Sequence, residues 1–320
     1  MAEQMDVVNS DTYYFKRLDP ELYSDLVYIS KSAFNIDPGI EYYIHKNQTE
    51  SFGPTNLGFI AYSSSGEPAA FYGVYSQPMI LDGVEILAAQ SGDTMTHKNH
   101  TGKGLFIKLA KMTFQLAKEM GVNFVFGFPN NNSYPGFIKK LEWNCPYKLH
   151  EYKLKISTLP LCKLAKKVNL FSPVYTIYRK FVFSLLSKKG DLFDSSVIEK
   201  GVGGVNRSSK YFNYKTFNGA FLIKVEACSV WLKTDGFMFI GDLQRKENMN
   251  YSNLISKLKN ICFWSGIDTL IFQTSPNSFL DVQLTEFLTP TEAFYMGYLN
   301  LNNKYRPEDF KFVFADVDTF

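Results

Sequence analysis

Two glycines in a short loop, Gly102 and Gly104, constrain the fold of this chain more than any other feature. The segment before the loop, 86–95, is apolar early and polar late, which predicts a strand. The segment after it has apolar residues at spacings of three and four, which predicts an amphipathic helix ending at Gly121. These apolar residues are Leu105, Leu109, Met112, Leu116 and Met120. Backbone N–H groups and the positive end of the helix dipole face outward from such a loop, so the pattern predicts an anion-binding site.

The segments after this helix support that interpretation. A Gly-x-Gly pair alone is also typical of a tight turn that needs glycine for backbone reasons. Here a second strand is expected at 123–128, and the run 129–133, rich in proline and asparagine, ends it. A short segment, 134–141, then leads to Trp143. The order of strand, loop, helix and strand favours the anion site over the tight turn.

This order resembles the core of the Gcn5-related N-acetyltransferases, the GNAT family. The pyrophosphate loop of that family has the form (Gln/Arg)-x-x-Gly-x-(Gly/Ala), and the matching positions here are Asn99, Gly102 and Gly104. The Leu-Gly-Phe that follows the family's next helix is similar to Leu141-Glu142-Trp143. The resemblance covers about residues 14–152 and implies an α+β (mixed α/β) fold, with a mixed sheet flanked by helices.

The residues before the loop fit the same order. Strands are expected at 57–62, 69–77 and 84–95, and Asp82-Gly83 is typical of the hairpin turn between the last two. A meander of this kind before the helix is expected in an α+β or mixed α/β domain.

Two helices are expected ahead of these strands. The first covers 18–34, where Asp19 suits the N-cap and Leu22, Leu26 and Ile29 form its buried stripe. The second covers 40–46. In the resembling family such helices lie beside the acceptor site, so the ring side chains of the second helix either line that site or cover the sheet. These side chains are Tyr42, Tyr43 and His45.

The second half of the chain repeats the order of meander, helix and strand. Strands are expected at 220–226, 229–233 and 237–241, a helix at 251–264, and strands at 269–273 and 310–315. The segment 242–250 holds no Gly-x-Gly. The repeat predicts a second, degenerate GNAT-like domain that lacks the glycine loop.

We therefore expect three parts in the chain. A GNAT-like acyl-CoA-binding domain covers 1–155, a basic helical linker covers 156–204, and the second GNAT-like domain covers 205–320. Gly201-Val202-Gly203-Gly204 is typical of a flexible joint between the last two parts.

The linker region has an unusual charge pattern. Between Tyr152 and Gly190 there is no Asp or Glu, whereas Lys and Arg recur among apolar residues, and Phe171-Ser172-Pro173 divides the segment into two helical pieces. Three interpretations stay open: the solvated face of a helical hairpin, a lid that attracts an anionic substrate, or a peripheral membrane contact through 153–189.

Composition excludes several classes of protein. The net charge of +3 over 320 residues is too small to indicate nucleic-acid binding. The four cysteines form no Cys-x-x-Cys pair, which argues against a zinc knuckle or a disulfide framework. The first residues are polar and acidic, unlike a secretory signal, and no apolar run reaches the length of a membrane span. A cytoplasmic protein is expected, of unspecified oligomeric state.

The GNAT resemblance implies acetyl-CoA as co-substrate and no metal. The pyrophosphate would lie on the backbone of the loop, and a main-chain N–H near Met95 would polarise the thioester carbonyl. The residues expected to bind the cofactor are Met95, Thr96, Asn99, His100, Thr101, Gly102, Lys103, Gly104, Leu105, Asn130 and Asn132. The two asparagines at 130 and 132 either hold the pantetheine amides or satisfy the turn.

The catalytic residues fit the family less well. The position that usually carries the acid tyrosine holds Ile138, and Tyr134, one helical turn earlier, is the candidate that replaces it. Asp93, near the polar end of its strand, is the candidate base, acting directly or through water; a structural carboxylate that caps the loop is the alternative. His97 and His100 lack a third ligand nearby in sequence, so a phosphate contact or simple exposure is expected rather than a zinc site.

The resemblance implies an N-acetyltransferase that moves an acetyl group from acetyl-CoA to a small amine. Proteins of this type accompany bacterial surface-polysaccharide synthesis, so an amino sugar, anionic or nucleotide-linked, is the expected acceptor. One alternative is a non-catalytic binding or regulatory protein with a GNAT fold, favoured by Ile138, Asn99 and Glu142. Another is an aminoacyl transferase of the peptidoglycan-bridge type. The sequence lacks a long helical-hairpin insertion rich in charges of both signs, which argues against this alternative.

Overall fold

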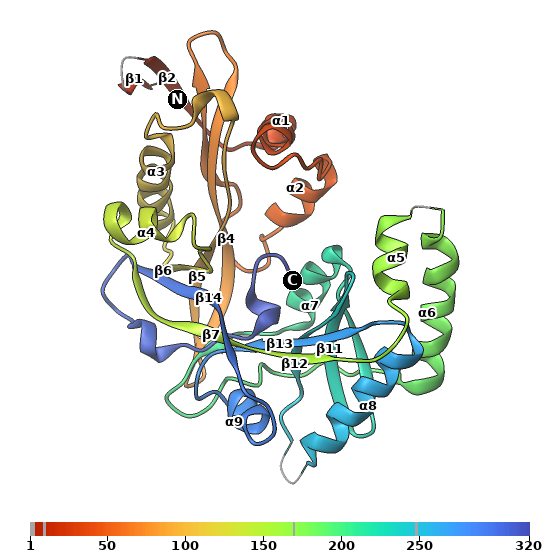
Figure 1. Ribbon diagram of the computed structural model, residues 1–320. Helices are drawn as coiled ribbons and strands as arrows, with labels where there is room; N and C mark the ends of the chain where they lie inside the picture. Colours follow the sequence, from red (N-terminus) through yellow and green to blue (C-terminus); the bar gives the residue numbers. More distant parts are fainter. Residues whose placement is uncertain (1–3, 9–10, 169, 247–248) are drawn as a thin grey trace. The chain divides into compact units, whose positions relative to one another are not determined.

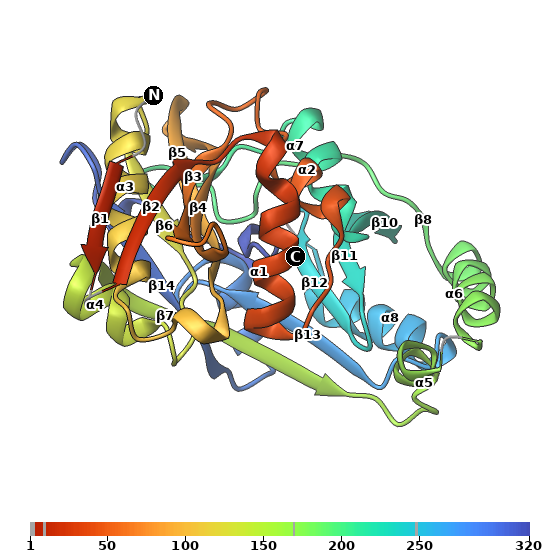
Figure 2. The same cartoon turned by 90° about the horizontal axis from the view of Figure 1, so that it is seen from above.

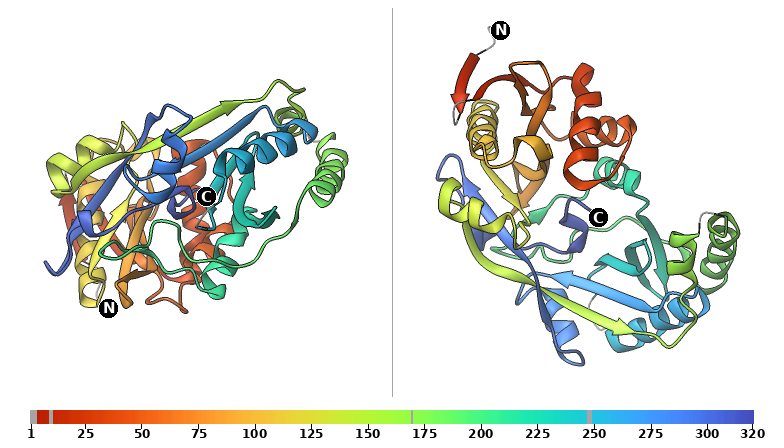
Figure 3. Two further views of the ribbon diagram at one scale, coloured as in Figure 1. Left: turned by 90° about the horizontal axis from the view of Figure 1, so that it is seen from below. Right: turned by 45° about the horizontal axis from the view of Figure 1, so that its top comes forward.

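A computed structural model describes residues 4–8, 11–168, 170–246 and 249–320. The chain forms two compact units. Unit 1 comprises 1–79, 85–146 and 295–307, and unit 2 comprises 80–84, 147–294 and 308–320. Each unit has its own succession of strands and helices, which Figures 1, 2 and 3 show in four orientations. Of the helices that are described, none is both long and apolar enough to cross a bilayer.

Unit 1 is built on a sheet in the order β1-β2-β3-β4-β5-β6-β14. Neighbouring strands are antiparallel along β1 to β4, β6 and β14 are antiparallel too, and β5 and β6 run parallel, as a helical crossover requires. The strands are β1 Gln4–Val8, β2 Asp11–Arg17, β3 Leu57–Ser63, β4 Pro68–Leu81, β5 Val84–Thr96, β6 Phe124–Gly127 and β14 Thr291–Asn300. The helices are α1 Tyr23–Phe34, α2 Ile40–Asn47, α3 Leu105–Glu119 and α4 Tyr134–Leu141, with the 3₁₀ turns Pro20–Leu22 and Lys98–His100.

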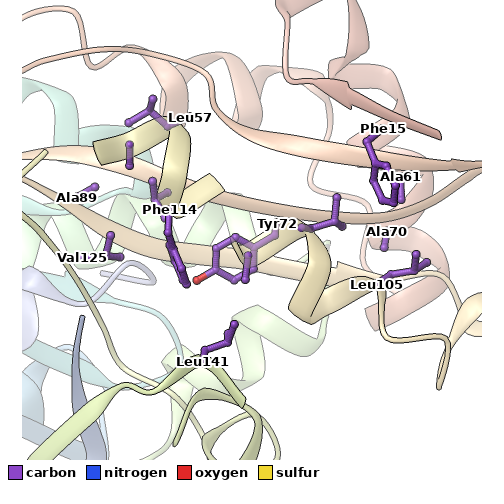
Figure 4. Close-up of a cluster of buried hydrophobic side chains, with 14 of the residues drawn as sticks. Phe15, Leu57, Ala61, Ala70, Tyr72, Ala89, Leu105, Phe114, Val125 and Leu141 are labelled. Atoms are coloured by element: carbon purple, nitrogen blue, oxygen red, sulfur yellow. The ribbon is translucent and has the colours of Figure 1, made fainter. Parts of the chain in front are cut away.

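The helices of unit 1 cover both faces of its sheet. Figures 1 and 2 show α1 and α2 on one side of the strands and α3 and α4 on the other. The larger core lies under α3 and α4, where Tyr72, Leu105, Phe114 and Leu141 are buried against the sheet (Figure 4). The second core, around Leu26, lies under α1 and α2.

The local sequence explains most of these elements. The side chain of Asp19 accepts from the N–H of Glu21, as an N-cap does, although the first turn is 3₁₀. Asp82 and Gly83 both have positive φ, which is the conformation of the tight hairpin turn expected there. In α3 the expected stripe was partly wrong. Its buried residues are Leu105, Leu109, Ala110, Thr113, Phe114 and Ala117, whereas Met120 is exposed because it is the C-cap residue, at the solvated end of the helix.

Unit 2 repeats the same order of elements. Its sheet runs β7-β13-β12-β11-β10-β8, with β12 parallel to β13 and the other pairs antiparallel. The strands are β7 Asn144–Lys155, β8 Lys188–Lys189, β9 Gly204–Val205, β10 Phe221–Val225, β11 Cys228–Thr234, β12 Met238–Leu243 and β13 Thr269–Thr274. The helices are α5 Leu161–Lys167, α6 Ser172–Leu186, α7 Ser209–Lys215, α8 Tyr251–Trp264 and α9 Phe279–Thr285, with 3₁₀ turns at Thr216–Asn218, Pro307–Asp309 and Phe314–Asp316.

The two units do not match the expected domain ranges, because each sheet includes a strand from the other half of the chain. After α4 the chain enters β7, which pairs with β13 in the sheet of unit 2. After α9 it enters β14, which pairs with β6 in the sheet of unit 1. The expected boundary at residue 155 therefore does not describe the structure, because each half of the chain supplies a strand to the sheet of the other half.

Two further expectations for the second half were wrong. The run 310–315 is not a strand but is buried around a 3₁₀ turn, because the Asp316 carboxylate accepts from the N–H of Val313 and pairs with Arg207. Gly203, in the expected flexible joint, is packed and bonded. Its N–H donates to Asp309 O at 2.7 Å, and its carbonyl accepts from Lys311 N at 3.0 Å.

Candidate functional site

The loop between β5 and α3 has the backbone that its glycines predict. Gly102 has φ of +74° and Gly104 has φ of +78°, a region that residues other than glycine rarely adopt. A Cβ added at Gly102 would meet no atom within 4 Å, so backbone conformation rather than crowding requires glycine there. Gly104 is the N-cap residue of α3 and has no side chain to accept from the first N–H groups of the helix. This helix end therefore suits an external anion.

A groove of about 760 Å³ lies against this loop. It is lined by the loop, the first turn of α3 and one face of α4. Its lining residues are Thr96, His100, Thr101, Gly102, Lys103, Gly104, Leu105, Phe106, Ile107, Pro135, Gly136, Lys139 and Lys140. Three lysines and no carboxylate are among them, so the groove has the charge that a phosphorylated ligand requires.

Most of the expected cofactor-binding residues meet in this groove, but four do not line it. Met95 is buried in the core under α2, with Tyr43 Oη 3.5 Å from its sulfur. Asn99 is exposed, and its N–H donates to His97 Nδ1 at 3.3 Å. Asn130 Oδ1 accepts from the N–H groups of Asn132 and Ser133, each at 3.0 Å, so the side chain of Asn130 holds the turn that leads into α4.

Asp93 is the centre of a polar cluster on the other side of the sheet. Its Oδ2 accepts from Tyr75 Oη at 2.5 Å and lies 2.7 Å from Lys46 Nζ, while Oδ1 lies 3.4 Å from Tyr42 Oη. The carboxylate is thus paired with a cation and does not cap the loop. Burial and the Asp93 charge raise the pKa of Tyr75 well above its ordinary value, so its hydroxyl keeps its proton and donates.

Asp93 also has an unusual backbone. Its φ is +50°, which is uncommon for a residue with a Cβ and is held only where the surroundings determine it. Such conformations cluster at functional sites. Asp93 and Tyr42 were expected near the site from the sequence, whereas Lys46 and Tyr75 were not. The spacing of four from Tyr42 places Lys46 on the same face of α2, but only the fold brings both residues to β5.

Tyr134 opens α4, and its ring stacks on Tyr295 of β14 with a centroid distance of 3.9 Å. Tyr295 belongs to unit 1 although it lies 161 positions further along the chain, which is why the sequence could not reveal the pair. Ile138, at the usual acid position, packs against the larger core and has no proton to donate.

A phosphate contact or simple exposure was expected for the two loop histidines, and simple exposure is wrong for both, although His100 does line the groove. His97 is 5% exposed and stacks on Tyr28, and both histidines face Glu67 from the β3–β4 hairpin. His100 Nε2 lies 3.3 Å from Glu67 Oε2, and His97 Nε2 lies 3.8 Å from Oε1. Glu67 is the third possible ligand that was missing from the local sequence, and the three ligand atoms lie within 4.8 Å of one another.

Hydrogen bonds link the side chains of this histidine cluster to one another and to their neighbours. His97 Nδ1 accepts from Asn99 N–H, so the neutral ring carries its proton on Nε2, the nitrogen that faces Glu67. His100 Nδ1 contacts Tyr13 Oη at 3.0 Å. Tyr28 Oη donates to Glu67 Oε1 at 2.8 Å, and this bond, followed by the one from His100, lowers the pKa of Glu67. The cluster thus ties the hairpin to the loop.

Together, the fold and the groove define a mixed α/β domain with a glycine loop at a helix N-terminus and a groove lined by lysines beside it. A family model described as an acetyltransferase (GNAT) domain matches residues 15–145. Those residues therefore form a domain of the GNAT acetyltransferase family. A search of the curated proteins gave no match.

Solved structures show the same fold over most of the chain. A GCN5-related N-acetyltransferase from Kribbella flavida is 10% identical with a TM-score of 0.54, covering 91% of this chain and 72% of that one. One from Anabaena variabilis is 13% identical with a TM-score of 0.54, covering 91% and 73%. Eis1 from Mycobacterium abscessus is 9% identical with a TM-score of 0.53, covering 90% and 73%. At these identities the similarity shows the fold alone.

Proposed function

We propose that this protein is an N-acetyltransferase that transfers an acetyl group from acetyl-CoA to a small amine. The observation that carries the proposal is the positive-φ pair Gly102 and Gly104 at the start of α3, opening on a groove lined by Lys103, Lys139 and Lys140. The backbone of this loop, the helix dipole and the lysines would hold the pyrophosphate.

The reaction would be a direct transfer. The amine nitrogen attacks the thioester carbonyl carbon, the C–N bond forms, and the C–S bond breaks. The amine loses a proton to a base, and the leaving thiolate takes one from an acid. Asp93 is the candidate base, directly or through water, because it is a carboxylate held in an uncommon backbone conformation. Tyr134 is the candidate acid, since Ile138 packs against the core and has no proton to donate.

The acceptor is proposed from chemistry and resemblance. An amino sugar that is anionic or nucleotide-linked carries negative charge. The net charge of +3 on this chain would attract it. The family's association with surface polysaccharides supports the same class. A cytoplasmic location follows from the need for acetyl-CoA.

The test is the binding of acetyl-CoA to two matched glycine variants. Gly102→Glu places a carboxylate in the groove, whereas Gly121→Glu carries the same change at a position that also has positive φ, +86°, and no atom within 4 Å of an added Cβ. Because Gly121 does not line the groove, it controls for backbone strain. A ligand at a hundredfold excess over its Kd stabilises the native state by about 2.7 kcal/mol.

We expect the wild type and Gly121→Glu to show this stabilisation in thermal unfolding with acetyl-CoA, and Gly102→Glu to lose it. Equal stabilisation of both variants would overturn the assignment of the loop. Absence of stabilisation in the wild type at millimolar acetyl-CoA would overturn the proposal.

A non-catalytic GNAT-fold binding protein is the second candidate, because Ile138 occupies the acid position. One measurement distinguishes the two candidate functions. Mass spectrometry of a panel of amines and amino sugars, incubated with the protein and acetyl-CoA, should show a product 42 Da heavier only if the protein is an enzyme.

A further inference from the structure

The helical hairpin of α5 and α6 in unit 2 exposes an apolar face that no described element of its own unit covers. Figure 1 shows the two helices side by side, with α8 near α6. In α6, Tyr175, Val182 and Phe183 are buried toward the unit. The opposite side shows apolar residues at spacings of three and four, with Ile177 exposed at 72% and Phe181 at 59%. The full stripe is Val174, Ile177, Phe181 and Leu185, with Tyr178 at its edge, where the hydroxyl donates to the carbonyl of Trp264 in α8.

We propose that this face binds the surface of a membrane that contains anionic phospholipid. A helix with one exposed apolar stripe and basic residues beside it lies in the headgroup region with the stripe inserted. Leu170, two residues before the start of α6, is exposed at 89%, and Leu164 of α5 is also exposed, so the hairpin has exposed apolar residues outside α6 as well. Apolar patches of this kind on soluble domains mark interaction sites.

The basic residues around the stripe favour an anionic partner. From Tyr152 to Gly190 the sequence has no Asp or Glu. Lys163 and Lys166 pair with Asp268 and Asp235. The remaining cations of the hairpin and its exit are Lys167, Arg179, Lys180, Lys188 and Lys189. On a helical wheel Lys180 falls beside the stripe, a position from which a long side chain reaches lipid phosphates. Arg179 lies on the buried side of α6, where its guanidinium donates to Thr234 Oγ1.

A second copy of the chain fits this face less well. Two copies meeting through it would bring together two hairpins that each have cations and no acidic residue of their own, and like charges across an interface oppose association. An anionic lipid surface complements both features at once, because it offers negative headgroups above an apolar layer.

Vesicle flotation of the full chain tests the proposal. Vesicles of phosphatidylcholine alone are compared with vesicles that also contain phosphatidylglycerol, at low and high salt. The apolar variant is Ile177→Asp with Phe181→Asp, and its control is Val282→Asp with Phe287→Asp, which changes two exposed apolar residues outside the hairpin. The charge variant is Lys167→Glu with Lys180→Glu, and its control is Lys200→Glu with Lys210→Glu, which changes two exposed lysines outside it.

We expect the wild type to float with the anionic vesicles, and increasing salt to weaken that binding. The apolar variant should bind at least about tenfold more weakly, and the charge variant at least about twentyfold more weakly, since each charge near an anionic surface is worth about fivefold. Both controls should bind as the wild type does. Circular dichroism of each variant confirms that these exposed substitutions spare the fold.

Three results would overturn the proposal: no flotation of the wild type with anionic vesicles, equal flotation with both kinds of vesicle, or equal losses in the variants and their controls. A fourth is a dimer in sedimentation velocity that Ile177→Asp dissociates, because a second copy would then cover the face. None of these outcomes depends on whether the protein binds acetyl-CoA.

Discussion

Tyr134 and Tyr295 present two hydroxyl groups on one stacked pair of rings, and only the first is proposed to donate a proton. Tyr134→Phe keeps the stack and removes that hydroxyl. We expect kcat to fall about a hundredfold or more while the KM for acetyl-CoA stays near its wild-type value, because general acid catalysis contributes about 10²–10⁴-fold. Tyr295→Phe is the matched control in the same steady-state assay. A similar loss in both variants would assign the effect to the stack.

The pKa of His97 leads to a prediction for stability. Burial is the main cause that lowers this pKa from its ordinary value near 6.5, against the opposing effect of Glu67. The unfolded chain therefore takes up a proton near pH 6.5 that the native His97 takes up only at lower pH. Stability consequently rises with pH through this window and falls as the pH drops below about 6.5.

The pH dependence can be checked by thermal unfolding between pH 5 and pH 7. His97→Gln should flatten the dependence in this window. The contribution of Glu67 is separable, because its lowered pKa adds stability that is lost only as the pH falls below its ordinary value near 4.5. An unchanged slope in His97→Gln would show that another group is responsible.

At the scale of elements, a buried ion pair joins α2 to β5. The side chains of Lys46 and Asp93 are only 4% and 15% exposed, and Lys46 Nζ also donates to Tyr42 Oη at 3.0 Å. Removing one partner of such a pair leaves an uncompensated charge, which costs about 3–5 kcal/mol, whereas replacing both can cost much less. The pair therefore sets where α2 lies on the sheet of unit 1.

We expect Lys46→Met to lower the free energy of unfolding by about 3 kcal/mol or more. The double variant Lys46→Met with Asp93→Leu should recover part of that loss. Urea unfolding of the two single variants and the double variant forms a double-mutant cycle, which isolates the coupling. Additive losses would indicate that the two residues act separately.

At the scale of the molecule, the exchange of β7 and β14 decides which segments fold together. Gly297 of β14 pairs with Gly127 of β6, and a Cβ at Gly297 would come within 2.6 Å of the Trp143 ring. Trp143 is itself 3% exposed. A fragment covering 1–155 lacks this strand, so β6 keeps an open edge and one side of Trp143 loses its cover.

We therefore expect the fragment 1–155 to be unfolded or aggregated in isolation. Trp143 is its only tryptophan, so the fluorescence of that residue reports its burial. A peptide covering 291–306 should shift the emission to shorter wavelength, while the same peptide with Gly297→Val should not. A folded fragment without the peptide would contradict the role given to β14.

The sequence by itself determined the elements whose physics is local. Gly102 and Gly104 need positive φ, Asp82-Gly83 forms the tight turn, and the periodicity of 251–264 predicted α8 at its observed bounds. Such features depend on residues a few positions apart. The resemblance to the GNAT family and the position of the glycine loop could be inferred from these local features.

Tertiary structure alone decided which distant segments meet. The pairing of β14 with β6, the stack of Tyr295 on Tyr134 and the approach of Glu67 to the loop histidines join residues separated by 30 to more than 160 positions. The run 310–315 looked like a strand because most of it is buried, but in the structure it makes isolated β-bridges and does not form a strand of the sheet. Periodicity reports which side of an element is buried, but not which partner buries it, and that choice depends on the packing of the whole chain.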